Sequence, residues 1–308
     1  MLSRIAESLF WIGRYTERAD STARLLDVHV QILLEDPWAE EDLACRSLLS
    51  VMDREPPPAD VVVGRDLVLR DLAYDRGTPS AIAGALVAAR ENARRAREVI
   101  STELWEALNT TWTQLPSHLH ASRPHGFFAW VRERSALVSG IVDQSISRDD
   151  TWHFLVLGRS VERADMTARL LTTRALAGAA GPDWATLLRS CGAHEAYLRR
   201  YRGLGSDRSA AEFLLTDRLF PRSVVAALAQ AQTCLDALDP AGRHTVDDAR
   251  RTLGHARTNL EYGVMPDLLE QLPAQMTTVQ LACSAASDAI RSRYFPSGSV
   301  TQWAGGVL

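Results

Sequence analysis

The sequence predicts an all-α protein, a helical bundle of about ten helices. Strand signals are poor, because the only cluster of β-branched residues, at 61–69, is short. Almost all other stretches show apolar residues at helical spacing and are rich in Ala, Leu, Arg and Glu. In addition, one helical stretch occurs twice, at 13–26 and at 158–171, with 11 of 14 positions identical.

Helical spacing and the turn-forming stretches between periodic segments give the expected helices in order. They are about 3–34, 41–53, 59–74, 79–111, 127–145, 149–177, 183–201, 207–217, 221–236, 244–262 and 266–293. Ser80, Asp149 and Asp183 stand where N-caps are expected. In the stretch FPRS, Pro221 suits the first turn of the next helix, and we expect a capping and packing role for Arg222.

The repeated stretch suggests how the chain is organised. We expect a single helical domain over 1–295, with possible internal halves 1–145 and 146–295, and a loose tail at 296–308. Outside the repeat the halves do not align. One intertwined bundle, with the two copies packed as a pseudo-symmetric pair, is therefore the more economical interpretation.

Composition excludes several function classes. The net charge of −4 gives no overall field for nucleic acid, and no apolar run approaches the length of a membrane span. All 34 basic residues are arginines, so lysine Schiff bases and the lysine of a P-loop are excluded. The four cysteines are far apart and form no disulfide framework, which favours a reducing cytoplasm.

The repeated helix carries its charges on one side. On a helical wheel, Glu17, Asp20 and Arg24 share a narrow stripe with Arg14 and Arg18 beside it. The second copy has the same pattern. We call the charged positions of both copies the polar seam: Arg14, Glu17, Arg18, Asp20 and Arg24, with Arg159, Glu162, Arg163, Asp165 and Arg169.

The two copies differ at three positions, and every charged residue is retained. Exposed ion pairs contribute little and have no reason to be kept twice. We therefore expect the polar seam to be buried between helices, with arginines and carboxylates neutralising one another, since lone buried charges are costly.

A second charged helix covers 89–109. Arg90, Arg94 and Arg97 line one stripe, flanked by Glu91 and Trp105. These arginines are natural partners for the glutamates of the seam, and they could equally form a cradle for a carboxylate or phosphate ligand. Three interpretations of the charged residues stay open: a structural ion network, which we favour, a ligand or partner site, and a metal site.

Other chemical sites find little support. A di-metal carboxylate bundle needs Glu-x-x-His, which is absent from the sequence. His118, His120 and His125 share a loop, but such loops are more often solvated than metal-bound. No glycine-rich phosphate loop, serine elbow or catalytic triad spacing is present, so we expect no metal and no cofactor.

Several motifs together resemble the bacterial alpha-E domain family, which is all-helical. They are MLSRIAESLFWIGRYTERADSTARLL, DRGTPSAI, ARENARRAREVISTELWEALN, WHFLVLGRSVERADMTARLL, FPRSV and RRTLGHA, and they cover nearly the whole chain. The resemblance places the family's named glutamates at Glu17, Glu91 and Glu162. Asp20 departs from the pattern, because a glutamate often follows ERA, and it shortens any reach from that position.

The resemblance also implies partners, because alpha-E proteins tend to be encoded beside or fused to a circularly permuted ATP-grasp amide ligase and a transglutaminase-like protein. The leading hypothesis is a helical accessory or binding partner of the ATP-grasp ligase in an amide- or peptide-forming system. One alternative is an enzyme for an anionic peptide-like substrate that uses Glu17 and Glu162 as acid and base. Another is a purely structural interaction protein. The oligomeric state is left open.

Overall fold

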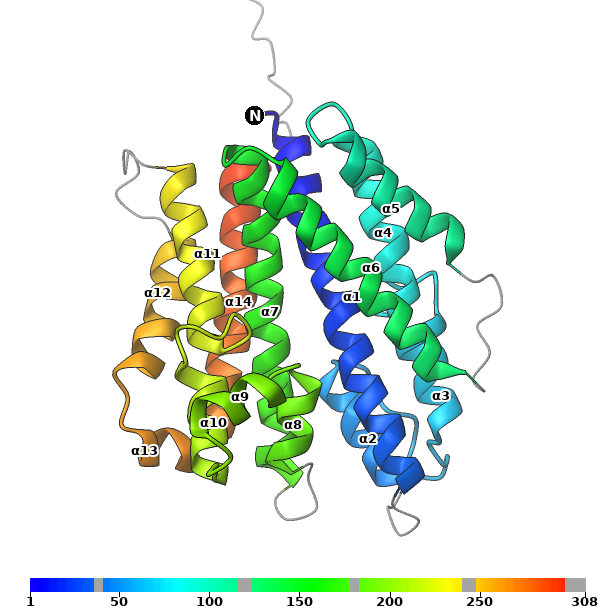
Figure 1. Ribbon diagram of the computed structural model, residues 1–308, viewed down its shortest axis with the longest axis vertical. Coiled ribbons are helices and arrows are strands. Elements are labelled where there is room, and N and C mark those ends of the chain that lie inside the picture. Colours follow the sequence, from blue (N-terminus) through cyan, green and yellow to red (C-terminus); the bar gives the residue numbers. More distant parts are fainter. Residues whose placement is uncertain (36–40, 116–122, 178–182, 240–247, 297–308) are drawn as a thin grey trace, which may run out of the picture.

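The computed structural model describes residues 1–35, 41–115, 123–177, 183–239 and 248–296 (Figure 1). These residues form helices joined by turns, without strands, which confirms the all-α class. The helices are α1 (Ser3–Glu35), α2 (Glu41–Val51), α3 (Arg65–Leu69), the π-helical turn η1 (Arg70–Tyr74), α4 (Ile82–Arg95), α5 (Thr102–Gln114), α6 (Pro124–Ser145), α7 (Asp150–Ala177), α8 (Trp184–Ser190), α9 (His194–Tyr201), α10 (Asp207–Thr216), α11 (Val224–Leu238), α12 (Asp248–Glu261), α13 (Met265–Glu270) and α14 (Leu272–Tyr294). None of these described helices is long and apolar enough to cross a membrane.

The described chain has somewhat more helices than the sequence predicted, because three predicted helices are interrupted. The stretch 79–111 is divided into α4 and α5, and the hydroxyl of Ser101 caps α5 by accepting a hydrogen bond from the Leu104 amide. The stretch 183–201 breaks where Gly192 adopts a positive φ of 62°, which favours glycine. A third break at Gln271 separates α13 from α14.

The expected helix starts are partly correct. Asp183 caps α8 by accepting a hydrogen bond from the Thr186 amide at 2.7 Å. Ser80 does not cap a helix, since α4 begins after Ala81 without a side-chain cap. The expected tail at 296–308 lies outside the described residues except for its first position.

The helices α1 and α7, which carry the two copies of the repeat, pack side by side in the middle of the molecule (Figure 1). On one flank α1 packs against α4 and α6, with α5 beside them. On the other flank α7 packs against α11 and α14, with α12 beside them. Each short helix contacts the central helix of the other half, because α2 contacts α7 and α8 contacts α1. By their contacts, α4, α5 and α6 on the first flank correspond in chain order to α11, α12 and α14 on the second.

Two glycines set the close approach of α1 and α7. A Cβ atom added at Gly13 would lie 2.0 Å from the backbone oxygen of Leu155. A Cβ atom added at Gly158 would lie 2.0 Å from the backbone oxygen of Phe10. Both contacts join equivalent positions of the repeat, so the helices cross on a local pseudo-two-fold axis with no room for a larger side chain at either glycine.

A second, shorter repeat becomes visible once the flanks are compared. The turn DRGTP (75–79) precedes α4, and the turn DRLFP (217–221) precedes α11. In each turn the aspartate accepts hydrogen bonds from the chain that follows: Asp75 from the Gly77 amide, and Asp217 from the Leu219 amide, both at 2.8 Å. The equivalent turns extend the internal correspondence beyond the repeated helix.

Candidate functional site

Glu162 lies at the centre of the polar seam and is bound by two arginines of α1. Arg14 donates from Nε to Oε2 at 2.6 Å, and Arg18 donates from Nε to Oε1 at 2.5 Å. The Glu162 side chain is 1% exposed. Arg14 also donates to the hydroxyl of Ser287 in α14 at 2.8 Å, which ties the seam to that helix.

Glu17, the equivalent residue of α1, is bound by two arginines from the other half of the chain. Arg163 of α7 donates to Oε2 at 2.6 Å, and Arg222 donates to Oε1 at 2.5 Å. The Ser21 hydroxyl donates to the same Oε1 atom at 3.2 Å. The carboxylates of the seam are thus buried between helices as the sequence predicts, while most of its arginines are partly buried, and its glutamates are paired across α1 and α7.

The two pairs break the symmetry of the repeat at one position. Arg159 is the equivalent of Arg14, yet it is paired with Asp143 of α6 at 3.2 Å. Arg222 takes its place beside Glu17. The capping and packing role expected for Arg222 is therefore wrong: the cap of α11 is the neighbouring Ser223, while the Arg222 guanidinium reaches into the seam.

The aspartates of the seam are also paired. Asp20 accepts from Arg24 at 3.0 Å and from Arg222. Asp165 accepts from Arg169 at 2.8 Å. Arg169 continues to Asp53 at 2.6 Å, beyond α2. Among the described atoms, the Oδ1 atoms of both aspartates are buried without a hydrogen-bond partner, so the ends of the seam are less completely satisfied than its centre.

The charges of the seam fix its protonation state. Burial raises the pKa of Glu17, but Arg163 and Arg222 outweigh it and bring that pKa down to about 2. Burial likewise raises the pKa of Glu162, and Arg14 and Arg18 outweigh it, so that its pKa is also about 2.

Asp165 differs, because burial raises its pKa and the charge of Arg169 only partly compensates. Both central glutamates are therefore carboxylates at neutral pH and hold no proton to donate. Such an enclosed network suits the joining of α1 to α7 better than acid–base catalysis.

The charged stretch 89–109, which is divided between α4 and α5, does not join the seam, which corrects the expected pairing of its arginines with Glu17 and Glu162. Glu91 instead binds Arg94 of its own helix at 2.6 Å. Arg90 lies over the ring of Trp112 at 4.6 Å and over that of Trp105 at 5.4 Å. Arg97 also lies over the Trp105 ring, at 4.8 Å.

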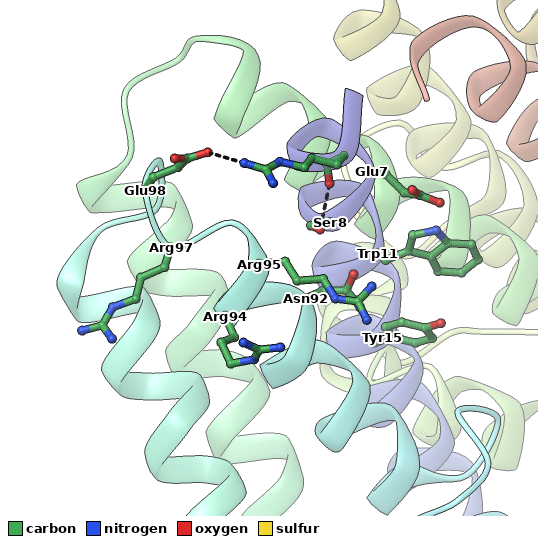
Figure 2. A pocket seen from close by; sticks show the side chains of 10 residues that line it. Glu7, Ser8, Trp11, Tyr15, Asn92, Arg94, Arg95, Arg97 and Glu98 are labelled. Atoms are coloured by element: carbon green, nitrogen blue, oxygen red, sulfur yellow. Dashed lines mark hydrogen bonds and ion pairs between the residues drawn. The ribbon is translucent and has the colours of Figure 1, made fainter. Parts of the chain in front are cut away.

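Beside this helix the structure has an open cavity of about 650 Å³ between the first turns of α1 and the end of α4. We call it the arginine groove. It is lined by arginines and two aromatic rings: Arg4, Arg94, Arg95, Arg97, Trp11 and Tyr15. Figure 2 shows Arg95 extending toward Trp11 and Tyr15, while Arg97 points away from them. Of these six, only Arg94 and Arg97 were predicted site residues.

The remaining candidate groups give no reactive centre in the described part of the chain. His125 binds Asp27 at 2.5 Å, and His118 and His120 lie outside the described residues. No group of three possible metal ligands occurs among the residues that the structure describes. All four cysteines are buried, and burial raises the pKa of the Cys45 and Cys191 thiols to about 12.

The fold and the seam define an all-helical protein whose two longest described helices are joined through Glu-Arg dipeptides. Glu17 pairs with Arg163, and Glu162 pairs with Arg18, so the glutamate of each dipeptide binds the arginine of the other. The chain belongs to the alpha-E family, described as a predicted alpha-helical domain with a conserved ER motif, whose model matches residues 1–295. The reciprocal pairs give a physical reason for such a motif.

Relatives of the chain are uncharacterized proteins of Mycobacterium bovis and of two strains of Mycobacterium tuberculosis. Each is 26% identical over 313 residues, which cover 91% of this chain and 34% of the relative. The chain thus spans about a third of the length of these relatives. No solved structure matches the chain.

Proposed function

We propose that this chain is a helical accessory protein that binds an ATP-grasp ligase, or the ligase's peptide-like substrate, in an ATP-dependent amide- or peptide-forming system. The proposal includes a transglutaminase-like protein as a further partner. The resemblance of the sequence motifs to the alpha-E family supplies the identity of these partners. The observation that carries the non-catalytic role is the enclosure of Glu17 and Glu162 by four guanidinium groups.

An acid–base enzyme would need at least one of these carboxyl groups to hold a proton near neutral pH and to reach a substrate. Both side chains are at most 3% exposed, and the pKa of each is about 2. The charged residues of the seam therefore serve the fold, and binding falls to the surface. The length of the mycobacterial relatives is compatible with a domain that works beside others.

The direct test uses the full chain together with the ATP-grasp ligase encoded beside it. We expect a complex in analytical ultracentrifugation and a change of roughly tenfold in the rate of ADP release with peptide-like acceptors, since positioning a reactant accounts for effects of that size or larger. If the ligase forms no complex with the chain and its rate of ADP release does not change, the proposal is contradicted.

A second measurement separates the accessory role from an enzyme. In an enzyme that uses the seam, Glu17→Gln would abolish turnover while the melting temperature stays the same. In an accessory protein, the same variant lowers the melting temperature, because Arg163 and Arg222 lose their shared counter-charge. Turnover by the isolated wild-type chain that is lost in a stably folded Glu17→Gln variant would favour the enzyme.

A further inference from the structure

We infer that the arginine groove binds a peptide segment that carries a carboxylate next to an aromatic or apolar side chain. The cavity of about 650 Å³ has the size of sites that hold a few residues or a small molecule. It lies between α1 and the end of α4, on the outside of the polar seam.

The carboxylate would bind Arg95. The Arg95 side chain is 63% exposed, and its closest ionic contact is Glu91 at 3.8 Å. Glu91 is already engaged by Arg94, which donates three hydrogen bonds to it at 2.6, 3.1 and 3.2 Å. Among the described residues no acceptor takes a hydrogen bond from Arg95, so its planar fork of N–H donors is free to bind a carboxylate in a bidentate manner.

Two aromatic side chains of α1 line the same cavity as these donors. Trp11 and Tyr15, one helical turn apart, have stacked rings with centroids 5.1 Å apart and an interplanar angle of 25°. The guanidinium of Arg14 lies 5.5 Å from the Trp11 ring, and that of Arg18 lies 5.5 Å from the Tyr15 ring.

Because both arginines are fixed by Glu162, the seam holds the rings in place before any ligand binds. Figure 2 shows Arg95 extending from α4 toward the two rings, and all three side chains line the same cavity. An apolar side chain of a ligand can therefore pack on the rings while its carboxylate pairs with Arg95.

The signs of the charges favour a peptide over a nucleotide. Glu7 and Glu98 also line the groove, so both acidic and basic side chains line the same cavity. Glu98 is paired loosely with Arg4 at 3.7 Å, and both side chains are more than half exposed. These carboxylates weaken the attraction of the groove for a triphosphate, whereas a peptide offers amide N–H groups to them and a single carboxylate to Arg95.

The assignment rests on the proposed function for its setting, a peptide-forming system, but binding can be measured without the ligase. The probe is a fluorescein-labelled peptide, Gly-Gly-Phe-Gln, in which the free C-terminus is the single peptide carboxylate. Its neutral counterpart is the same labelled peptide with an amidated C-terminus. Fluorescence anisotropy with the full chain at low salt reports the affinity of each.

We expect the free-acid peptide to bind and the neutral peptide to bind at least roughly tenfold more weakly, because the charged pair is lost. Arg95→Glu removes measurable binding of the free acid, while Arg199→Glu changes it by less than about twofold, since that charge lies outside the groove. Circular dichroism melting of both variants shows whether they are folded.

Arginine-selective dicarbonyl labelling read by mass spectrometry locates the site. The free-acid peptide should protect Arg95 and leave Arg199 reactive. Absence of binding, equal binding of both peptides, or preference for ATP over the free-acid peptide would overturn the assignment. Lost peptide binding with an intact ligase complex contradicts only the groove. Intact peptide binding without a ligase complex contradicts only the proposed function.

Discussion

The polar seam and the arginine groove use the same kinds of residues on two faces of α1, with opposite outcomes. In the seam, Glu162 is 1% exposed and two arginines share it. In the groove, Arg95 is 63% exposed and has no hydrogen-bond acceptor among the described residues. Enclosure forces charges to neutralise one another, whereas an open surface can keep a cation available for a ligand.

The two regions are connected through α1. Arg14 and Arg18 bind Glu162 in the seam, and their guanidinium groups also lie against the aromatic rings that line the groove. The seam therefore acts as a rigid support for the groove. Variants of the seam should therefore change stability strongly, and variants of the groove should change stability little.

The largest effect is expected at the helix crossing. Gly158→Val places side-chain atoms where the backbone oxygen of Phe10 now lies, so α1 and α7 cannot approach. We expect a loss of more than about 4 kcal/mol in the free energy of unfolding, or failure to fold. Urea unfolding followed by circular dichroism measures it.

The control for the crossing is Gly140→Ala in α6, where an added Cβ atom meets nothing within 4 Å. This variant should be neutral or more stable by about 0.5–1 kcal/mol, because alanine favours a helix over glycine. A Gly158→Val variant as stable as the wild type would show that the crossing is not fixed by these glycines.

The next effect compares the seam directly with the groove. Glu162→Gln keeps the side-chain shape but leaves Arg14 and Arg18 without their counter-charge, and it should cost about 3–5 kcal/mol. Glu91→Gln, beside the groove, should cost less than about 1 kcal/mol, as for other pairs near the surface. Equal losses in the two variants would break the distinction between the regions.

Acid should weaken the seam by a comparable amount. The pKa of Glu17 and of Glu162 is lowered from 4.5 to about 2, so the unfolded chain binds more protons between these values. Each carboxylate thus contributes about 3 kcal/mol above pH 4.5, and this stability is lost as the pH falls from about 4.5 to 2. Asp165, with a raised pKa, acts in the opposite sense and offsets part of the loss.

Unfolding measured at a series of pH values from 7 to 2 checks this dependence. In Glu162→Gln, the part of the acid dependence that belongs to Glu162 should be absent, so its curve is flatter by about 3 kcal/mol. Parallel curves for the wild type and the variant would mean that Glu162 does not titrate as the seam requires.

The smallest of these effects tests Arg222, which breaks the symmetry of the seam. Arg222→Gln leaves Glu17 with Arg163 and Asp20 with Arg24, so about 2 kcal/mol should be lost rather than the full cost of an unpaired charge. Arg208→Gln, an exposed residue of α10, should change the melting temperature very little. If both variants have the melting temperature of the wild type, Arg222 is not part of the network.

The sequence identified the charged stripe of the repeat as buried because both copies retain it, and burial of Glu17 and Glu162 agrees. It failed at Arg222, since no second copy of that arginine exists: Ser80 stands at the corresponding place after DRGTP. It also assigned the wrong partners to Arg90, Arg94 and Arg97. Helical spacing gives the face of a residue on its own helix but not the helix that it faces.

By itself, the sequence determined the helical class, the repeated helix and the need for its charges to neutralise one another, because these depend on local periodicity and on the cost of burying charge. Only the tertiary structure decided which arginine meets which glutamate. That choice follows from the crossing of α1 and α7 at Gly13 and Gly158, which brings residues more than 140 positions apart into contact. It also decided that Arg95 faces an open cavity, a property of two packed helices and not of either one alone.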